Sequence, residues 1–244
     1  MDIKKVLEQH EIWIYSNGES GEQADLSYAN LRNSNLSYIN LSDAKLRYAD
    51  LRDANLREAN LSDADLRYAD LRGAQLSNAD LSWTNLRVAS LNNANFRNAD
   101  MRCVDLRGAD LREANLRDAN LLAALLREAD LRNTDLRGAN LLHANLRNVK
   151  LKDTYLPEST FIISDEKCFI SICGDEVRVD FRVPSVRVDL RVHSVSEWRQ
   201  FSKQDIVNMF GKNSFKFYSH ILDIIDSYCG KGERPKWLKK WNDG

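Results

Sequence analysis

The sequence repeats every five residues over more than half of its length. From Leu26 to Phe161 every fifth residue is leucine, and the exceptions are Phe96, Met101 and Phe161 itself. The residue two positions earlier is nearly always small, and the residue between them is usually Asp or Asn. A period of five matches neither the helical repeat of about 3.6 residues nor the alternation of a strand. Neither element can therefore bring these leucines to one interior.

A coil with four five-residue sides accounts for this period. Four units close a turn of twenty residues, in which each leucine and the small residue two before it point to the axis. Successive turns then stack as parallel strands about 4.8 Å apart. Small residues are needed because four sides share one narrow, densely packed core. The repeat predicts an all-β solenoid, a quadrilateral parallel β-helix of about seven turns, over residues 24–163.

The repeated motif A-(D/N)-L-x-x across residues 24–156 resembles that of the pentapeptide-repeat family. The resemblance covers more than half of the chain and implies a right-handed quadrilateral β-helix. A helical solenoid is not expected, because no helical repeat has a five-residue unit.

Residues 1–23 are expected to form an N-terminal helix and cap. The pattern predicts a short helix around residues 3–10, followed by the apolar stretch Ile12–Tyr15 and a Gly-Ser turn. An open end of the coil would expose its leucines and unpaired strand edges, and this segment is expected to cover them.

Residues 164–244 are expected to form a small α+β region. Apolar and polar residues alternate from 168 to 192 and predict strands, with Gly174-Asp175 as a turn. Ser196 is a candidate helix cap, and Ser202 with Asp205 has the pattern of a capping box.

The apolar spacing of residues 214–228 predicts a further helix with one buried face. Residues 193–210 and 216–225 together resemble the C-terminal extension of phage and prophage pentapeptide-repeat proteins. This likeness implies a phage or mobile-element origin and assigns no chemistry.

Composition narrows the class of protein. The formal net charge is -1, and the four cysteines have no CxxC spacing, so we expect no metal site, no cofactor and no disulfide framework. No apolar run is long enough for a signal peptide or a membrane span. The expected location is the cytoplasm, away from membranes.

Three sides of the predicted coil carry arginine after the central leucine. Residues 24–156 contain nineteen Lys and Arg against eighteen Asp and Glu, and most arginines lie two residues from Asp or Asn. We therefore expect a solvated surface of interleaved charges and no direct nucleic-acid binding. The three stacks are Arg47, Arg67, Arg87, Arg107, Arg127 and Arg147; Arg32, Arg52, Arg72, Arg112 and Arg132; and Arg57, Arg97, Arg117 and Arg137.

The remaining side, here called the fourth face, differs from the other three. It is built on Leu41, Leu61, Leu81, Met101, Leu121, Leu141 and Phe161 and has no arginine before Arg102. Its first half is mildly acidic and its second half is apolar, with Ile162 at the end. A contiguous apolar strip on a charged rod calls for a cover. The candidate interaction face comprises Asp43, Asp63, Asp80, Trp83, Asp100, Leu122, Leu125, Leu142 and His143.

Two alternatives remain for what covers this apolar strip. The C-terminal region can fold back onto it, which is the favoured alternative, or it can serve as a dimer or target interface. The chain is accordingly expected to be a monomer or a homodimer.

Two smaller groups of residues were considered as sites. Tyr28, Tyr48 and Tyr68 are spaced by twenty and predict a stabilising aromatic ladder rather than a base-stacking platform. His143 and Cys103 share the fourth face, but no third group orients the imidazole and no oxyanion donor is evident, so no catalysis is expected.

The sequence favours a non-enzymatic protein-binding scaffold of phage or mobile-element origin, which presents the fourth face and a C-terminal module to a host protein. Two alternatives stay open. The family resemblance implies a DNA-mimicking ligand of DNA gyrase, although the near-zero net charge and the arginines on three faces depart from that pattern. The C-terminal resemblance implies a phage counter-defence protein.

Overall fold

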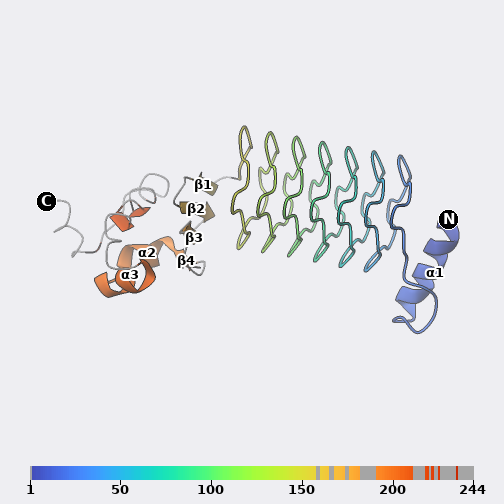
Figure 1. Cartoon of the computed structure of the whole chain (residues 1–244), viewed down its shortest axis with the longest axis horizontal. Coiled ribbons are helices and arrows are strands. Elements are labelled where there is room, and N and C mark those ends of the chain that lie inside the picture. The colour runs from blue at the N-terminus through green and yellow to red at the C-terminus, as the bar shows by residue number, and fades with distance from the viewer. Residues whose placement is uncertain are drawn as a thin grey trace. The chain divides into compact units, whose positions relative to one another are not determined.

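The computed structural model divides the 244-residue chain into two units, Met1–Glu158 and Ser159–Gly244 (Figure 1). It describes residues 2–157, 160–164, 168–173, 176–181, 191–210, 218–219, 221–222, 225 and 235. The elements in chain order are α1 (Ile3–Tyr15), β1 (Thr160–Ser164), β2 (Cys168–Cys173), β3 (Glu176–Phe181), β4 (Arg191–Ser194), α2 (Val195–Gln200) and α3 (Lys203–Phe210).

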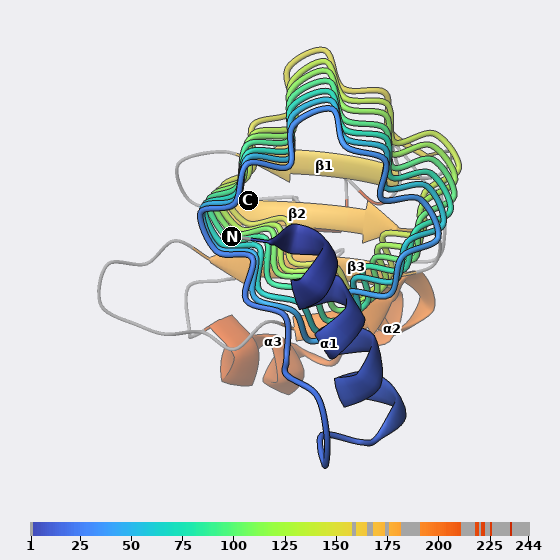
Figure 2. The same cartoon turned by 90° about the vertical axis from the view of Figure 1, so that its right-hand side faces the viewer.

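The first unit is a stack of twenty-residue turns. Parallel β-bridges join residues twenty apart at every fifth position, from Asp25↔Lys45 to Asp135↔Tyr155. Two backbone hydrogen bonds form each rung. In the first rung the Leu26 N–H donates to the Lys45 carbonyl (2.7 Å) and the Lys45 N–H donates to the Ala24 carbonyl (2.9 Å). Seen along the coil, the turns superpose into one four-sided outline (Figure 2). The predicted parallel β-helix is confirmed.

The core contains the two inward positions of each unit. The central leucines from Leu41 to Leu136, together with Phe96 and Met101, are fully buried, as are most of the alanines two residues earlier. Where the small position is threonine, its hydroxyl finds a backbone partner. Thr84 and Thr134 donate to the carbonyls of Leu61 and Leu111, each at 2.7 Å. A buried hydroxyl is tolerated there because it is hydrogen-bonded.

The four corners of each turn require a left-handed backbone. The Ala29 N–H bonds to the Leu26 carbonyl at 3.0 Å, and Tyr28 between them has φ of 61°, as in a type II turn. The same corner position has positive φ in every unit from Tyr28 to Asp153. Asn, Asp and Gly adopt this conformation most readily, whereas Val88, with φ of 57°, is β-branched and therefore strained.

The coil ends earlier than the sequence period indicates. The last rung is Asp135↔Tyr155, and the next predicted core and face residues, Phe161 and Ile162, lie in β1. There they pair antiparallel with Ile172 and Ser171 of β2. The predicted boundary at residue 163 is therefore wrong, and the division falls after Glu158. The reason is that a strand partner competes with the coil for the β-prone residues after Pro157.

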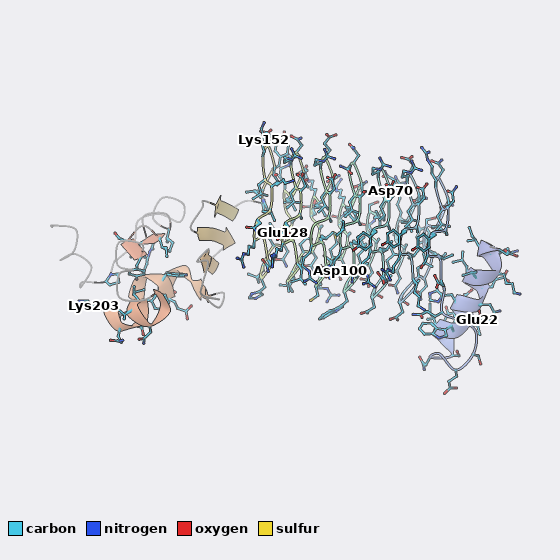
Figure 3. All side chains as sticks on the ribbon, viewed as in Figure 1. Glu22, Asp70, Asp100, Glu128, Lys152 and Lys203 are labelled. Carbon is cyan, nitrogen blue, oxygen red and sulfur yellow. The ribbon has the colours of Figure 1, made fainter. Side chains whose placement is uncertain are left out.

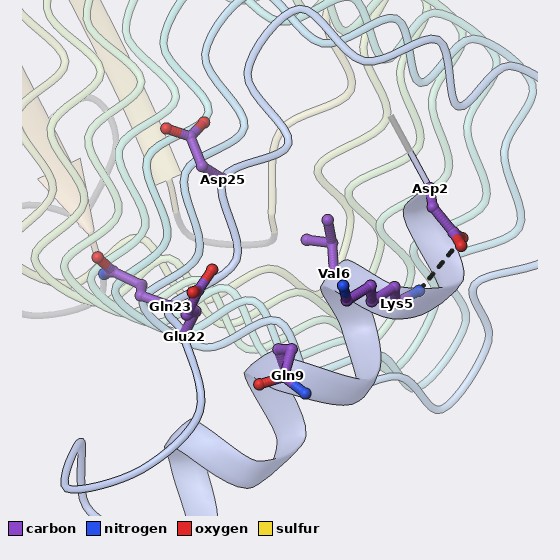
Figure 4. A pocket seen from close by; sticks show the side chains of 7 residues that line it. All are labelled: Asp2, Lys5, Val6, Gln9, Glu22, Gln23 and Asp25. Carbon is purple, nitrogen blue, oxygen red and sulfur yellow. Dashed lines mark hydrogen bonds between the residues drawn. The ribbon is translucent and has the colours of Figure 1, made fainter.

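The N-terminal helix is longer than predicted. Helix α1 begins at Ile3, where the Asp2 carboxylate accepts the Lys5 N–H at 3.3 Å, and continues to Tyr15. The apolar stretch expected after residue 10 thus belongs to the helix. A cleft of about 270 Å³ separates part of α1 from the start of the coil (Figure 4), and it is lined by Asp2, Lys5, Val6, Gln9, Glu22, Gln23 and Asp25.

His10 joins the cap to the first turn of the coil. It is the one fully buried residue of α1, and its Nδ1 accepts the backbone N–H of Ala24 at 3.1 Å. Its ring stacks on Trp13 with centroids 5.7 Å apart. Burial lowers the pKa of His10 and outweighs the opposing effects of the Ser42 backbone and the Asp43 charge. The neutral imidazole therefore holds the cap in place.

The second unit contains an antiparallel sheet of order β1-β2-β3-β4, followed by helices. The predicted Gly174-Asp175 turn lies outside the described residues, between strands that pair Cys173 with Glu176. Ser196 lies inside α2 and does not cap it. The capping box before α3 is confirmed, because Ser202 N–H donates to Asp205 at 2.9 Å and Asp205 N–H donates to the Ser202 hydroxyl at 3.2 Å.

Buried aromatic and aliphatic residues hold the helical part of this unit together. Trp198 and Tyr218 are fully buried, and the Tyr218 hydroxyl donates to the Trp198 carbonyl. Ile206, Ile221, Leu222 and Ile225 are buried as well. The described residues from 218 to 225 are helical, in agreement with the apolar spacing read from residues 214–228.

Replacing Val88 with Asn is expected to stabilise the coil. Asn adopts positive φ with less strain, and Val88 is 49% exposed, so little apolar burial is lost. We expect the free energy of unfolding to rise by about 1 kcal/mol, measured by denaturant titration. The reverse exchange, Asn93→Val at the equivalent corner, should lower it by a similar amount. If both substitutions changed the free energy of unfolding in the same direction, the role assigned to positive φ would be contradicted.

The cap is expected to loosen as the pH falls. Because the pKa of folded His10 lies below its unfolded value of about 6.5, its contribution is complete above that pH and is lost as the pH falls through the folded pKa. Limited proteolysis of α1 should accelerate between pH 7.5 and pH 5. His10→Gln should remove this pH step, whereas the exposed control His143→Gln should retain it.

Candidate interaction face

Backbone hydrogen bonds bring the predicted fourth-face residues together along one side of the coil. Asp43 N–H donates to Ser62 at 2.9 Å, Asp63 N–H to Ser82 at 3.0 Å, and Trp83 N–H to Arg102 at 2.9 Å. The bridge column of the same side runs Asn40, Asn60, Asp80, Asp100, Asn120 and Asn140. Leu125 lies in the neighbouring column, between Asp105 and Asn145, as its corner position predicted.

The first half of the fourth face holds three carboxylates without a cationic partner. Asp43 and Asp63 are exposed, and Asp80 is half-buried and accepts the Ser82 N–H at 2.9 Å. Among the described residues none of the three lies within ion-pair distance of a cation, although the charges of Asp80 and Arg102 interact at longer range. Partial burial and the charges of Asp43 and Asp80 raise the pKa of Asp63. These side chains therefore form a patch of uncompensated negative charge.

Asp100 does not add to this patch. Arg102 Nε donates to its Oδ1 at 2.8 Å, and Arg102 Nη2 lies 2.6 Å from its Oδ2. This bidentate pairing lowers the pKa of Asp100 despite its partial burial. The acidic strip predicted to run through Asp100 therefore ends at Asp80.

The other three sides neutralise themselves by a local pairing rule. An Asp at the bridge position accepts the N–H two residues later, and an Arg at that later position also folds back onto the same carboxylate. Arg52 Nε, for example, lies 2.8 Å from Asp50 Oδ1, and this pairing lowers the pKa of Asp50 to about 2. The same bidentate pairs form at Arg67, Arg72, Arg107, Arg112, Arg132 and Arg137.

Asparagine at the bridge position leaves the arginine side chain unclamped. Asn85 and Asn55 accept only the backbone N–H of Arg87 and Arg57, at 3.3 Å and 3.4 Å. An arginine after Asn thus lacks this local pair, although some find an acid on the next turn, as Arg32 does at Asp53 (3.6 Å) and Arg97 at Asp118 (3.8 Å). Figure 3 shows the outward side chains along the coil, with Asp70 and Asp100 labelled. This difference between Asp and Asn at the bridge position was not among the predictions made from the sequence.

The second half of the fourth face is apolar but shorter than predicted. Leu122, Leu125 and Leu142 are half-buried and His143 is exposed, whereas Ile162 lies in β1 and leaves the strip. Trp83, 65% exposed, is the large apolar side chain that lies open between the acidic and apolar halves.

Cys103 and His143 do not form a nucleophile and base. Cys103 N–H bonds to Leu122, and Ala123 N–H bonds to Leu142, so the two residues are separated by two rungs. At about 4.8 Å a rung their backbones are roughly 10 Å apart, beyond a nucleophile–base hydrogen bond. Among the described residues, no group of three or more His, Cys, Asp or Glu could hold a metal ion.

The predicted tyrosine ladder is present at another corner. The rings of Tyr28 and Tyr48 stack at 5.0 Å, and those of Tyr48 and Tyr68 at 4.9 Å, with planes within 7°. Tyr48 is stacked on both faces and Tyr28 and Tyr68 on one face each, and a ladder that stabilises neighbouring turns is the better description.

A second concave region lies beside α1. A cleft of about 410 Å³ is lined by Lys4, Leu7, Glu8, Glu11, Ile14, Tyr15, Tyr38, Ile39 and Asn40. Its wide, mixed lining shows no converging set of polar groups, so it does not have the character of a ligand site. In the part of the chain that the structure describes, no helix is both long and apolar enough to cross a membrane.

Comparison with known proteins identifies the repeat. The family model described as pentapeptide repeats matches in eight copies, over residues 24–63, 44–82, 54–91, 79–118, 114–153 and 124–161. A search of curated proteins finds no match.

Several solved structures are similar to the chain. Trypsin-treated QnrB1, a plasmid-mediated fluoroquinolone resistance protein, is 26% identical over 50% of this chain and 60% of its own, with a TM-score of 0.30. HetL, involved in heterocyst differentiation regulation in the cyanobacterium Nostoc sp. strain PCC 7120, is 31% identical over 56% and 84%, with a TM-score of 0.23. A pentapeptide repeat protein of the Arabidopsis thaliana thylakoid lumen is 27% identical over 41% and 70%, with a TM-score of 0.28.

Removing the charge of Asp63 is expected to stabilise the coil. Its pKa is raised because its ionised form is disfavoured beside Asp43 and Asp80, so stability should fall as the pH rises through that pKa. Asp63→Asn keeps a residue suited to positive φ and should raise the free energy of unfolding by about 0.5 kcal/mol at low salt. High salt should reduce the gain. Asp50→Asn, which breaks an ion pair, should have the opposite sign.

Proposed function

Because the chain belongs to the pentapeptide-repeat family, we propose that it is a non-enzymatic scaffold that binds a protein through the fourth face. One observation carries this proposal. Asp43, Asp63 and Asp80 form no ion pair among the described residues and lie beside the exposed Trp83, on a rod that pairs most of its bridge-position aspartates with arginine.

The chemistry of this face favours a basic partner. Three carboxylates supply attraction that steers a cationic surface to the face, and Trp83 belongs to the residue types that most often anchor protein interfaces. The backbone is held by rungs on every side. Binding therefore requires little ordering of the scaffold, which reduces its entropic cost.

The apolar half of the fourth face enlarges the proposed binding surface. Leu122 and Leu142 extend the surface beyond Trp83, and their cover is either the C-terminal region, a second copy or the target itself. The C-terminal unit is proposed to act as a further module toward a host protein, as its likeness to phage and prophage proteins suggests.

DNA gyrase is the second candidate partner. The family resemblance supplies this idea, and the carboxylates of Asp43 and Asp63 favour it, because they recur at successive rungs as charges do along a nucleic-acid backbone. The arginines on the other sides favour a partner that contacts one side only. Counter-defence against a bacterial host is a third role compatible with the same face.

Charge removal from the fourth face tests the proposal. The triple variant Asp43→Asn, Asp63→Asn and Asp80→Asn retains residues suited to each backbone position. We expect it to lose at least tenfold in affinity for proteins that the wild type captures from bacterial lysate at low salt. The matched control, Asp53→Asn, Asp118→Asn and Asp153→Asn, changes net charge equally on other sides and should bind normally. Equal losses in both variants would exclude the fourth face.

The same variants separate the candidate partners. A gyrase ligand should alter DNA supercoiling by purified gyrase, and the fourth-face triple variant should not. No effect of excess wild-type protein on supercoiling would remove gyrase while leaving capture of another target to be identified by mass spectrometry.

Charged replacements test the cover of the apolar half. Leu122→Asp with Leu142→Asp should lower the thermal unfolding midpoint if the strip is covered within the chain, which is the expected result. A stable, monomeric variant of a dimeric wild type, measured by light scattering, would instead place a second copy there.

A further inference from the structure

We infer that the coil carries a second docking surface, which shares Trp83 with the fourth face and extends onto the adjoining side, for a protein segment that presents a carboxylate beside an apolar side chain. This surface, here called the Trp83–Val88 patch, consists of Trp83, Arg87, Val88 and Tyr68. It lies on the side built on Leu26, Leu46, Leu66, Leu86, Leu106, Leu126 and Leu146, which adjoins the fourth face at Trp83.

Two strained and exposed apolar residues bound the patch. Trp83 and Val88 occupy the two corners of one five-residue side, with φ of 61° and 57° and exposures of 65% and 49%. Asn, Asp or Gly would suit both corners better. The positive φ costs backbone free energy at both corners, and the exposed side chains gain little burial that could offset this cost. Positive φ occurs at every corner of the coil, so the feature that points to a contact surface is the exposure of two large apolar side chains at the corners of one side.

The neighbouring turns leave the apolar corner open. Tyr68 N–H bonds to the Arg87 carbonyl at 3.1 Å, which places Tyr68 beside Val88 on the preceding turn. On the following turn stands Gly108, where an added Cβ would lie 3.7 Å from Val88 Cγ2. Without a side chain at Gly108, one flank of Val88 stays uncovered. Tyr68 and Val88 thus form a short apolar ridge.

Arg87, between the two corners, forms no ion pair with any acidic residue in the described part of the chain. Its neighbours along the stack are clamped, because Arg67 and Arg107 bind Asp65 and Asp105 with Nη2–Oδ2 distances of 2.5 Å. Asn85 stands at the equivalent position for Arg87 and accepts only its backbone N–H. The Arg87 guanidinium is exposed and retains its capacity for a bidentate bond to a carboxylate. Arg with Trp and Tyr is the composition of an interface anchor.

Charge complementarity selects a protein segment rather than a nucleic acid. A polyanion gains affinity by meeting several free cations, and here both flanking arginines are already neutralised. Asp63 precedes Trp83 along its corner by one turn, and its charge opposes a polyanion at each phosphate but a single carboxylate on Arg87 only once. One face of the Tyr68 ring is covered by Tyr48, so the patch has no extended platform on which successive bases could stack. One free guanidinium between two apolar corners fits a single carboxylate with an adjacent apolar side chain.

Peptide selection on the full-length protein tests this surface. Random 12-residue peptides displayed on phage are selected against the whole chain, and the enriched peptides are labelled with fluorescein and titrated by fluorescence anisotropy. We expect enrichment of Asp or Glu next to a large apolar residue. Arg87→Gln and Val88→Asn should each weaken binding at least tenfold, and replacing the peptide's acid with its amide should do the same.

The controls separate binding from folding. Val88→Asn is expected to stabilise the coil, so its loss of binding cannot come from unfolding, and a thermal melt verifies this. Arg57→Gln changes an exposed arginine that also follows Asn and has no ion pair among the described residues, but lies on another side; its affinity should be unchanged. The fourth-face triple variant should also bind the peptides normally. Peptide binding that is insensitive to Arg87→Gln, failure to select any peptide, or Arg87-dependent binding of single-stranded DNA would overturn the proposal.

Discussion

The parallel ladder of backbone hydrogen bonds between residues twenty apart is the constraint on which the rest of the first unit depends. Each rung fixes one five-residue side above the next, so the inward leucine and the small residue before it have no alternative but a shared narrow core. Volume at the small position is limited for that reason, and Thr84 and Thr134 are accepted only with their hydroxyls bonded to the backbone. The outward positions carry no such restriction and are available for charge, stacking or contact.

The same ladder turns local sequence into surface electrostatics. An aspartate at the bridge position is held in place by the N–H two residues later, and this geometry presents its carboxylate to an arginine at that residue. Pairing within a single unit therefore neutralises an arginine and an aspartate in eight units of the coil. Charge survives only where the rule is broken, as at Asp80, which precedes Ser82, and at Arg87, which follows Asn85. The two proposed surfaces are both defined by such breaks.

The two surfaces differ in the sign of their free charge. The fourth face offers carboxylates and Trp83, whereas the Trp83–Val88 patch offers a guanidinium and two apolar corners. The two surfaces meet at Trp83. Because their free charges have opposite signs, a ligand that suits one surface does not suit the other. A rigid rod suits this arrangement because its rungs fix the separation between the surfaces without a flexible linker.

The five-residue period alone determined the coil, its core and the side on which each residue lies, because a repeat that recurs at every turn leaves one solution for the interior. It also identified the tyrosine ladder and the fourth face. The end of the coil was decided by tertiary structure, since Phe161 and Ile162 fit the period yet find a strand partner in β2. Helix α1 likewise extended beyond its predicted end to Tyr15. The pairing of Asp with the Arg two residues later, as at Asp100 and Arg102, became evident only from the side-chain geometry of the turn, although the Asp or Asn that governs it can be read in the sequence.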